Sequence, residues 1–358
     1  MAPGSIDTQQ TTGPERRDAY AHAGVDLDAR GDLVRRIRDI AARASRPEVL
    51  SGVGPFGALF RLGSYREPVL ASSTDGVGTK LRIAILMDRY DTVGQDLVNH
   101  CVNDILTTGA EPLFFLDYIG SSALGAHQKL EVVRGLTEAC RAHDCAFVGG
   151  ETADMPDVYG AGDFDLVGFI VGVVERADVI DGSKIAPGDA LIGLPSSGLH
   201  TNGYSLVRRI FGIGTGGDAA ADRRALERTH PPLEQPLGEA LLAVHRSYLH
   251  ELRPVLKKLH GIAHITGGGI IDNVPRILPD GLAARFDRRA WETPALFALI
   301  QRAGDLSDDE MYRTFNMGIG IVAAVAADEA DDITQAVPGA RIVGDVVRAS
   351  DARRVIIE

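Results

Sequence analysis

The stretch DLVNHCVNDILTTGAEPLFFLDY, residues 96–118, indicates how the first half of this chain folds. Its apolar residues recur at helical spacing as far as Leu106, and the same pattern begins upstream at about Thr92. Gly109 and Pro112 are typical of a helix end. The run LFFLDY that follows predicts a buried strand, so a helix leads directly into a strand.

Helices and strands continue to alternate on both sides of this stretch. In the first half the patterns predict helices at 31–44 and 131–144 and strands at the start of 68–87, at 145–152 and at 164–174. In the second half they predict strands at 190–197, 340–347 and 353–358 and helices at 206–211, 270–278 and 328–336. One long helix is predicted at 238–259.

A polar stretch at 175–189 interrupts this pattern, and we place a domain boundary there, near Gly182. The mixture favours two α+β (α/β mixed) domains over one doubly wound sheet. We therefore predict a loose tail at 1–18, an N-terminal domain at 19–182 and a C-terminal domain at 183–358.

Length and charge exclude several classes of protein. The 358 residues suit two domains of ordinary size. The 49 acidic and 37 basic residues give a net charge of −12 without a basic run, which argues against nucleic acid or an anionic membrane as a partner. A small phosphorylated ligand stays compatible with this charge. No apolar run reaches the ~18 residues of a membrane span, and the first residues lack the apolar core of a secretory signal.

The cysteines and histidines show no metal-binding spacing. Cys101, Cys140 and Cys145 suit neither a disulfide framework nor a zinc ribbon, and a reducing cytoplasm is the simplest location. The ten histidines include no HExxH or HxH pair, which argues against a catalytic metal on imidazole. His200 and His264 stand out because of their loops. Surface or packing roles are expected for His143, His245, His250 and His260.

Three familiar motifs are excluded by their context. GxGxxG occurs at Gly52, Gly54 and Gly57 and again at Gly212, Gly214 and Gly217. Neither copy follows a strand, so flexible turns are favoured over dinucleotide binding. The segment DGVGTK has the wrong spacing for a Walker A loop, and Ser196 and Ser197 lie in no GxSxG elbow.

Carboxylates at strand ends are a better signal. Asp75, Asp117 and Glu151 each close an apolar run beside glycine or a hydroxyl residue. Strand ends in one sheet lie near each other, and gathered carboxylates repel unless a cation lies between them. Mg²⁺ commonly bridges one or two carboxylates to substrate phosphates. Solvated acids or helix caps are the alternative.

Helix geometry adds Asp104. It lies at the border of the broad apolar face of the helix within 92–112, with His100 and Asn103 on the adjoining polar arc. A carboxylate turned partly toward the protein needs a metal or a basic side chain as partner. Lys80 would then offer a point charge to a phosphoryl group, unless it is a surface lysine.

Two loops suit a substrate. HITGGG, residues 264–269, runs into a predicted helix, and its backbone N–H groups suit a phosphate, although a tight turn would look the same. SSGLHTNGYS, residues 196–205, clusters polar side chains that suit a sugar or an amide. A helix cap made by Thr201 or Asn202 is the alternative reading.

These segments together resemble a known family. PVLASSTDGVGTKLRIA, the deciding stretch, FVGGETADMP, DLVGFIVGVVE, LPSSGLHTNGYSLVR, HITGGGIIDNVPRILP and MYRTFNMGIG occur in this order. They resemble the aminoimidazole ribonucleotide synthetases, or phosphoribosylformylglycinamidine cyclo-ligases, from about Tyr20 to the C-terminus. Asp104, Gly109, Ala110 and Pro112 match a signature of the wider ATP-binding superfamily, which includes selenophosphate synthetase and thiamine-monophosphate kinase.

The resemblance implies a ligase of purine biosynthesis in the cytoplasm. It would convert formylglycinamidine ribonucleotide to aminoimidazole ribonucleotide with ATP and Mg²⁺, releasing ADP and phosphate. It also implies a homodimer in which the N-terminal sheets of two subunits, each packed by helices, pair into a barrel, with a C-terminal α/β sandwich. A small-molecule kinase of the same superfamily and a catalytically silent nucleotide-binding subunit are the alternatives.

The expected site residues follow from these readings. Catalytic roles are expected for Lys80, His200 and His264. ATP or phosphate contacts are expected from Asp75, Gly76, Gly78, Thr79, Lys80, Asn103, Asp104, Gly150, Glu151 and Thr152. Substrate contacts are expected from Ser197, Gly198, His200, Thr201, Asn202, His264, Thr266, Gly267, Gly268 and Gly269. The expected metal ligands are Asp75, Asp104, Asp117 and Glu151.

The chain departs from the family pattern in three places. Ala21 and Arg38 stand where relatives often have lysine. A family stretch resembling Pro-Thr-Lys-Ile-Tyr-Val-Lys is here Val-His-Arg-Ser-Tyr-Leu-His, residues 244–250, which places His245 at the threonine.

Overall fold

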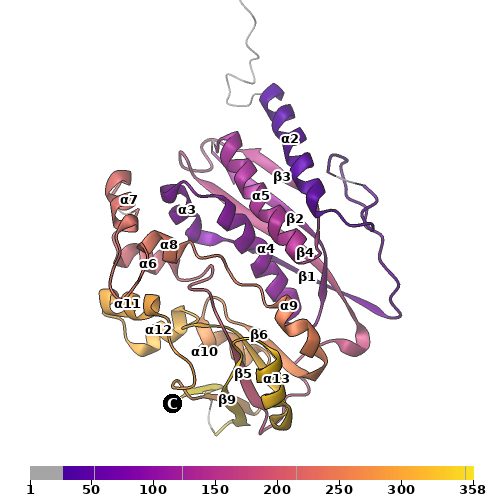
Figure 1. Cartoon of the computed structure of the whole chain (residues 1–358), viewed down its shortest axis with the longest axis vertical. Helices are drawn as coiled ribbons and strands as arrows, with labels where there is room; N and C mark the ends of the chain where they lie inside the picture. The colour runs from indigo at the N-terminus through magenta and orange to yellow at the C-terminus, as the bar shows by residue number, and fades with distance from the viewer. Residues whose placement is uncertain (1–26, 52, 123, 215, 351) are drawn as a thin grey trace, which may run out of the picture.

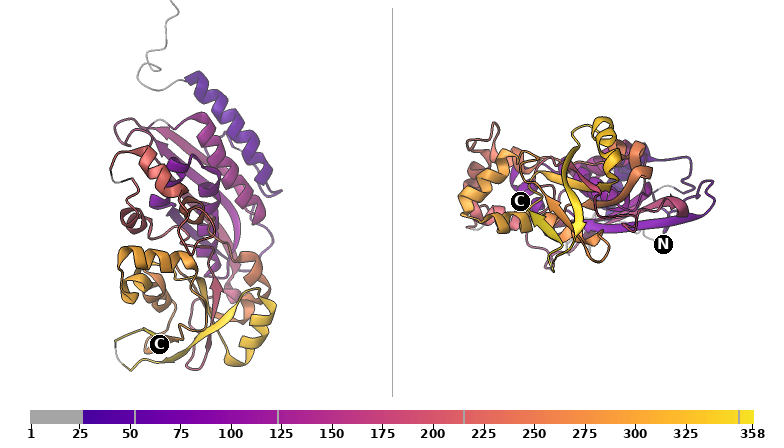
Figure 2. Two further views of the ribbon diagram at one scale, coloured as in Figure 1. Left: turned by 60° about the vertical axis from the view of Figure 1, so that its left-hand side comes forward. Right: turned by 90° about the horizontal axis from the view of Figure 1, so that it is seen from below.

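The computed structural model describes residues 27–51, 53–122, 124–214, 216–350 and 352–358. The predicted tail and the departure at Ala21 lie outside these residues. The predicted mixture of α and β structure is confirmed, with two sheets in the described part of the chain. The two halves lie one above the other along the long axis (Figures 1 and 2).

The N-terminal half is built on a four-stranded sheet in the order β1-β4-β2-β3. Its strands are β1 Pro68–Gly76, β2 Glu111–Ser121, β3 Ala146–Asp154 and β4 Phe164–Glu175. Only the β2–β3 pair is parallel. The helices are α2 Leu27–Ala41, α3 Leu81–Met87, α4 Asp91–Leu106 and α5 Ala126–Ala142, with short turns η1 Ala42–Ala44 and η2 Gly78–Lys80. Helices α2, α4 and α5 lie side by side over the sheet (Figure 1).

The C-terminal half is built on a six-stranded sheet in the order β10-β7-β9-β5-β8-β6. Its strands are β5 Ala190–Pro195, β6 Leu259–His264, β7 Leu282–Phe286, β8 Ile319–Val325, β9 Arg341–Arg348 and β10 Val355–Ile357. Its helices are α6 Tyr204–Ile210, α7 Ala219–Glu227, α8 Leu237–Leu241, α9 Leu249–Leu252, α10 Gly269–Asn273, α11 Ala295–Gly304, α12 Asp308–Thr314 and α13 Ala330–Ala336. The 3-10 turns are η3 Arg176–Asp178, η4 Arg253–Lys258, η5 Val274–Arg276 and η6 Ala327–Glu329.

The connection from β4 to β5, residues 176–189, contains the predicted boundary near Gly182. No helix in the described part of the chain is long and apolar enough to cross a membrane. The three cysteines are buried and free.

Helix α4 is held close to the first sheet by glycines on β4. A Cβ built on Gly168 would lie 2.9 Å from the Leu97 side chain, and one on Gly172 would lie 2.6 Å from Ile105. Real Cβ atoms do not approach this closely, so glycine is required for this packing. The helix thereby fixes the position of its polar residues relative to β1.

The polar arc of α4 is not exposed to solvent. Asp96, His100 and Asn103 are all buried, because the C-terminal half covers this side of the helix. The helix therefore packs on both sides, and its polar residues lie in the contact between the two halves. From periodicity alone, the polar side of a helix such as α4 would be expected to face solvent.

The predicted helix at 238–259 is wrong. Residues 243–248, which we call the strap, are neither helix nor strand and separate α8 from α9. Side chains of the N-terminal half satisfy the strap's backbone. Lys80 Nζ donates to the carbonyl of Ala243 (2.7 Å), and the N–H of His245 donates to Asp96 Oδ1 (2.7 Å).

Asn103 completes this arrangement by bonding the strap twice. Its Nδ2 donates to the carbonyl of Arg246 (2.8 Å), and its Oδ1 accepts the N–H of Tyr248 (3.0 Å). A helix would compete for the same backbone groups. Because the backbone of the strap bonds these side chains instead, residues 243–248 do not form a helix although their sequence has helical spacing.

Candidate functional site

A cleft of about 490 Å³ opens between the two halves. Strand β1 and helix α4 form one wall, and β6 with the loop and turns after it forms the other. Polar side chains predominate among the residues that line it: Ser72, Ser73, Thr74, Asp75, His100, Asp104, Thr107, His264, Thr266, Asn273 and Arg276.

Two of the predicted carboxylates share the N-terminal wall of this cleft. Asp75 Oδ2 lies 2.9 Å from His100 Nε2. Asp104 accepts from Ser73 Oγ at Oδ2 (2.7 Å) and lies 2.8 Å from His264 Nδ1 at Oδ1. Their side chains are 42% and 26% exposed, so both face the cleft without being fully solvated. The predicted need of Asp104 for a partner is met by a histidine.

Electrostatics keeps both carboxylates charged. Burial raises the pKa of Asp75, but the hydrogen bond and charge of His100 outweigh burial and lower it. Burial likewise opposes ionisation of Asp104, and His264 and His100 bring its pKa below the usual value. The carboxylates in turn raise the pKa of His100 against the effect of its burial. This wall of the cleft therefore carries negative charge at neutral pH.

Asp117 and Glu151 do not join this pair. Asp75 and Asp117 both stand opposite Gly168 of β4, on strands to either side of it. A Cβ on that glycine would lie 2.4 Å from Phe115 and 2.9 Å from Leu97 of α4, so apolar side chains fill the space over it. Within the described residues, the close groups of possible metal ligands are His200–His245–His264 and His100–Asp104–His264, and neither contains Asp117 or Glu151.

Asp117 instead lines a cavity of about 90 Å³ beneath α2 and α5, with Val34, Ile37 and Val133. Burial, and to a smaller extent the charge of Glu151, raises the pKa of Asp117 to about 8. A protonated carboxyl in an apolar cavity is a poor magnesium ligand. Gly150, Glu151 and Thr152 line the same small cavity rather than the cleft.

Lys80 is neither a surface lysine nor part of the cleft lining. Its side chain is 0% exposed, and Nζ lies 2.8 Å from Asp96 Oδ2. Together with its bond to Ala243, this contact uses the amine inside the interface between the halves. Nearby, Gly78 and Thr79 form the exposed turn η2, where Thr79 Oγ1 lies 3.0 Å from Ser205 Oγ.

The loop at 196–205 faces the strap and α4. Ser197 Oγ donates to the carbonyl of Val244 (2.6 Å), and Thr201 Oγ1 lies 2.9 Å from His100 Nδ1. Gly203 is the N-cap of α6 and no side chain caps this helix, so the cap reading of Thr201 and Asn202 is wrong. The loop therefore links the cleft wall to the strap.

The loop at 264–269 begins in the cleft. His264 and Thr266 line it, and Gly268 and Gly269 have φ angles of 92° and 60°. A Cβ on Gly269 would lie 2.0 Å from the carbonyl oxygen of Tyr312, so only glycine fits there. Gly267 lies close to Asn202 Oδ1. The glycines therefore let the backbone of this loop pack closely against the segment at Tyr312. Thr266 Oγ1 donates to Asn273 Oδ1 (3.2 Å).

Among the residues at this site that were not expected as site residues, three stand out. His100 lines the cleft, and Arg276 is the one lysine or arginine among the described residues lining it. Arg276 Nη1 donates to Asn273 Oδ1 at 3.3 Å. His245, expected to be a surface or packing residue, is 0% exposed and lies at the centre of a histidine cluster. The only advance signal was the departure from the family pattern at the strap.

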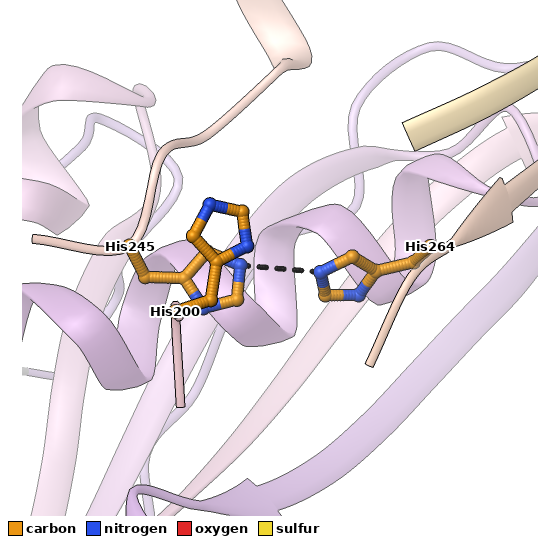
Figure 3. Close-up of side chains that lie close together, drawn as sticks. All are labelled: His200, His245 and His264. Carbon is orange, nitrogen blue, oxygen red and sulfur yellow. Dashed lines mark hydrogen bonds between the residues drawn. The ribbon is translucent and has the colours of Figure 1, made fainter. Parts of the chain in front are cut away.

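That cluster joins His200, His245 and His264 behind the cleft wall (Figure 3). His245 Nε2 lies 3.1 Å from His264 Nε2, and the rings of His200 and His245 stack with centroids 3.9 Å apart. Burial lowers the pKa of all three histidines, although Asp104 partly opposes this at His264. The rings are therefore neutral at pH 7.

Comparisons with known proteins agree along nearly the whole chain. Residues 57–174 match the model of the N-terminal domain of AIR synthase related protein, and residues 186–357 match that of its C-terminal domain. The chain is 50% identical over 319 residues to a phosphoribosylformylglycinamidine cyclo-ligase of Desulfitobacterium hafniense, covering 88% of this chain and 91% of the relative. It is 48% identical over 358 residues to the protein of the same name in Bordetella petrii, covering 97% and 100%.

Solved structures share the fold at low identity. The hydrogenase maturation protein HypE in complex with ATP superposes with a TM-score of 0.63 at 17% identity, covering 94% of this chain and 92% of that one. Thiamine-monophosphate kinase from Stenotrophomonas maltophilia superposes with a TM-score of 0.56 at 17% identity, covering 91% and 95%.

Proposed function

The chain belongs to the family of AIR synthase related proteins, and from this membership we propose that it closes the imidazole ring of aminoimidazole ribonucleotide as an ATP-dependent cyclo-ligase. The observation that carries the proposal is the identity of about half the residues to curated cyclo-ligases over 88% to 97% of this chain. The polar cleft between the halves supplies a site of matching chemistry.

The reaction must turn an amide oxygen into a leaving group. In the proposed sequence, the formyl amide oxygen of formylglycinamidine ribonucleotide attacks the γ-phosphorus of ATP, and ADP leaves. A nitrogen of the same molecule then attacks the activated carbon, the C–O bond breaks and phosphate departs with its oxygen. A proton is lost as the ring closes. The protein's part is to position the reactants and to balance charge.

Asp75 and Asp104 suit Mg²⁺. Both are ionised and reach the cleft, and carboxylate oxygens are the ligands that this ion prefers. We assign them as the residues that would hold it. When bound, the ion neutralises charge on the polyphosphate of ATP. Asp117 is left out of this assignment because its carboxyl holds a proton at neutral pH.

The opposite wall suits the ribose phosphate. Thr266, Asn273 and Arg276 line it, and the glycines at 267–269 bring backbone close to the cleft. Arg276 supplies a permanent cation that can bond a phosphate through two N–H groups. We assign the 5′-phosphate of the substrate to this wall.

His264 is the better placed of the two histidines expected to move the proton. It lines the cleft, whereas His200 is absent from the lining and 1% exposed. Asp104 accepts a hydrogen bond from Nδ1, and Nε2 lies 3.1 Å from His245 behind the cleft wall, so acting as a base requires the ring to turn its Nε2 lone pair into the cleft. Lys80 and Asn103 act by holding the strap in this assignment, not by touching ATP.

The first sheet has an open face that suits the homodimer. Phe169 of β4 and Leu70 of β1 are 42% and 60% exposed, and the pairing register places them on the face opposite α4. We propose that two such faces pair, as the resemblance implies. Phe169→Lys should then give a monomer of about half the wild-type mass by sedimentation equilibrium. Val158→Lys, at a residue 70% exposed outside the sheets, should leave that mass unchanged.

One assay tests the reaction itself. Purified protein is incubated with ATP, Mg²⁺ and formylglycinamidine ribonucleotide, and aminoimidazole and free phosphate are measured. Asp104→Asn should lower the rate by about 100-fold or more, because charge balance at the phosphates is lost. Asp309→Asn, at an exposed residue of α12, is the matched control. Phosphate retained on the substrate, with no ring product, would indicate a kinase and overturn the proposal.

A further inference from the structure

The histidine cluster contains ligand geometry that the ring closure does not use. One ring nitrogen from each of His200, His245 and His264 lies within 4.8 Å of the other two. The three residues are 1%, 0% and 6% exposed. They come from a loop, the strap and the end of β6, so no local sequence motif joins them. This explains why the search for HExxH or HxH spacing missed the cluster.

Two of these nitrogens present lone pairs to each other. His264 Nδ1 donates to the ionised Asp104, so the neutral ring has its lone pair at Nε2. Asn103 is oriented by its two bonds to the strap, and its remaining N–H faces His245 Nε2 at 3.2 Å. His245 therefore also has its lone pair at Nε2. Facing lone pairs 3.1 Å apart repel unless a cation lies beside them.

His200 brings a third nitrogen to the same place. Its Nδ1 is buried and has no hydrogen-bond partner. Figure 3 shows a ring nitrogen of His200 turned toward the pair formed by His245 and His264. Ligation through Nδ1 would move the His200 proton to Nε2 and give up a contact of 3.2 Å with the N–H of Ser197. Ligation would also release the contact of His245 Nε2 with Asn103 (3.2 Å) and turn His200 out of its stack on His245, because a metal lies in the plane of each imidazole that binds it. Three metal–nitrogen bonds outweigh these weak contacts.

We propose that His200, His245 and His264 bind one divalent transition-metal ion, with Zn²⁺ as the preferred occupant. Zn–N bonds of ~2.0–2.1 Å place two nitrogens of a tetrahedral site roughly 3.3 Å apart, close to the separation seen here. Asp104 behind His264 forms the carboxylate–histidine pair that commonly orients a zinc ligand. Mg²⁺ does not compete here because it prefers oxygen ligands.

The central ligand of the proposed site, His245, lies in the stretch that departs from the family pattern. His245 stands where the family stretch has threonine, so relatives with threonine lack the central ligand. His264 held by zinc at Nε2 has no lone pair left for the proton of ring closure. Zinc should therefore inhibit the reaction. This consequence rests on the proposed function, whereas zinc binding itself does not.

The test compares wild type, His245→Thr and His250→Ala. All three are stripped of metal, checked for folding by circular dichroism and dialysed against Zn²⁺ without nucleotide, and bound zinc is measured by atomic emission. Wild type and His250→Ala should hold one zinc per chain. His250 is the matched control because it also follows the family departure but bonds the carbonyl of Ala142 outside the cluster. His245→Thr should bind at least about 100-fold more weakly.

A second measurement does not depend on the variant. Co²⁺ added to metal-free wild type should give the strong visible bands of a four-coordinate site, and Zn²⁺ should abolish them. The proposal is overturned if wild type binds no zinc, if His245→Thr binds zinc as tightly as wild type, or if Co²⁺ gives only the weak spectrum of the hydrated ion. Zinc binding without ring closure would separate this inference from a failure of the proposed function.

Discussion

On the side of α4 that faces the C-terminal half, Asp96 and Asp104 each have a basic partner, whereas Asp117 on the other side has none among the described residues. Asp96 lies against Lys80, and Asp104 against His264. Asp117 lies under α2 and α5, and no ion pair between described residues includes it. The histidines lower the pKa of Asp104, whereas burial raises that of Asp117 to about 8 and also raises that of Asp96 against the effect of Lys80.

The difference shows that a carboxyl's role follows from what covers it. The C-terminal half covers one side of α4 with His264 and the strap, and His264 together with His100 of α4 can offset the desolvation of Asp104. Helices α2 and α5 cover the other side with valine and isoleucine, which cannot. In the proposed assignment, the carboxylates that serve the reaction therefore lie where the two halves meet, and Asp117 lines the small cavity under α2 and α5.

The largest expected effect comes from removing the cation of a buried pair. Lys80→Met should lower the free energy of unfolding by about 3–5 kcal/mol, because Asp96 is left buried without a counter-charge. Lys129→Met is the control: Lys129 pairs with Asp154, whose side chain is 40% exposed, and the loss should be about 1 kcal/mol or less. Urea denaturation measures both, and equal losses would contradict the comparison.

A smaller effect should separate the two sides of α4 in catalysis. Asp75→Asn should slow ring closure by about 100-fold, or roughly 2.7 kcal/mol, because a carboxylate facing the phosphates is lost. Asp117→Asn should leave the rate within about twofold of wild type, since an amide replaces a protonated carboxyl of similar shape. Steady-state kinetics with the natural substrates measures both. A similar loss in both variants would restore Asp117 to the expected set of metal ligands.

The sequence predicted what depends on local pattern. The strands of the first sheet, helix α4 and the two polar loops at 196–205 and 264–269 follow from periodicity and glycine placement, and Asp75, Asp104, His264 and Thr266 do line one cleft. Whether all four predicted carboxylates meet in one site depends instead on the strand order and on which side chains cover the sheet between them. Phe115 and Leu97 fill the space over Gly168, which stands opposite both Asp75 and Asp117, and the sequence near these two aspartates does not reveal this.

The strap could not be predicted for a related reason. Residues 238–259 have helical spacing, and their local propensity is satisfied only if their backbone groups bond one another. In the structure Lys80, Asp96 and Asn103 take those groups, and they lie more than 130 residues earlier in the chain. The positions of His245 and Arg276 depend in the same way on how the halves pack.

The last comparison concerns the pH dependence of stability, for which the pKa shifts of Asp117 and Asp75 have opposite directions. The folded pKa of Asp117, about 8, lies above its ordinary value of 3.8, so between these values the unfolded chain has lost a proton that the folded chain retains. Stability relative to Asp117→Asn should therefore fall as pH rises, by about 1.4 kcal/mol per unit between pH 5 and 7. Urea denaturation of both proteins at each pH measures this slope.

Asp75 supplies the opposite case. Its folded pKa is lowered, so the stability it contributes should be complete above its ordinary pKa of 3.8 and lost as pH falls through the folded value. Between pH 5 and 7 wild type and Asp75→Asn should therefore keep a constant difference in stability. If the stability difference between wild type and Asp117→Asn is also independent of pH between 5 and 7, Asp117 is ionised throughout this range. The apolar side chains of α2 and α5 would then not prevent ionisation of Asp117. The carboxyls on the two sides of α4 would differ only in whether they reach the cleft.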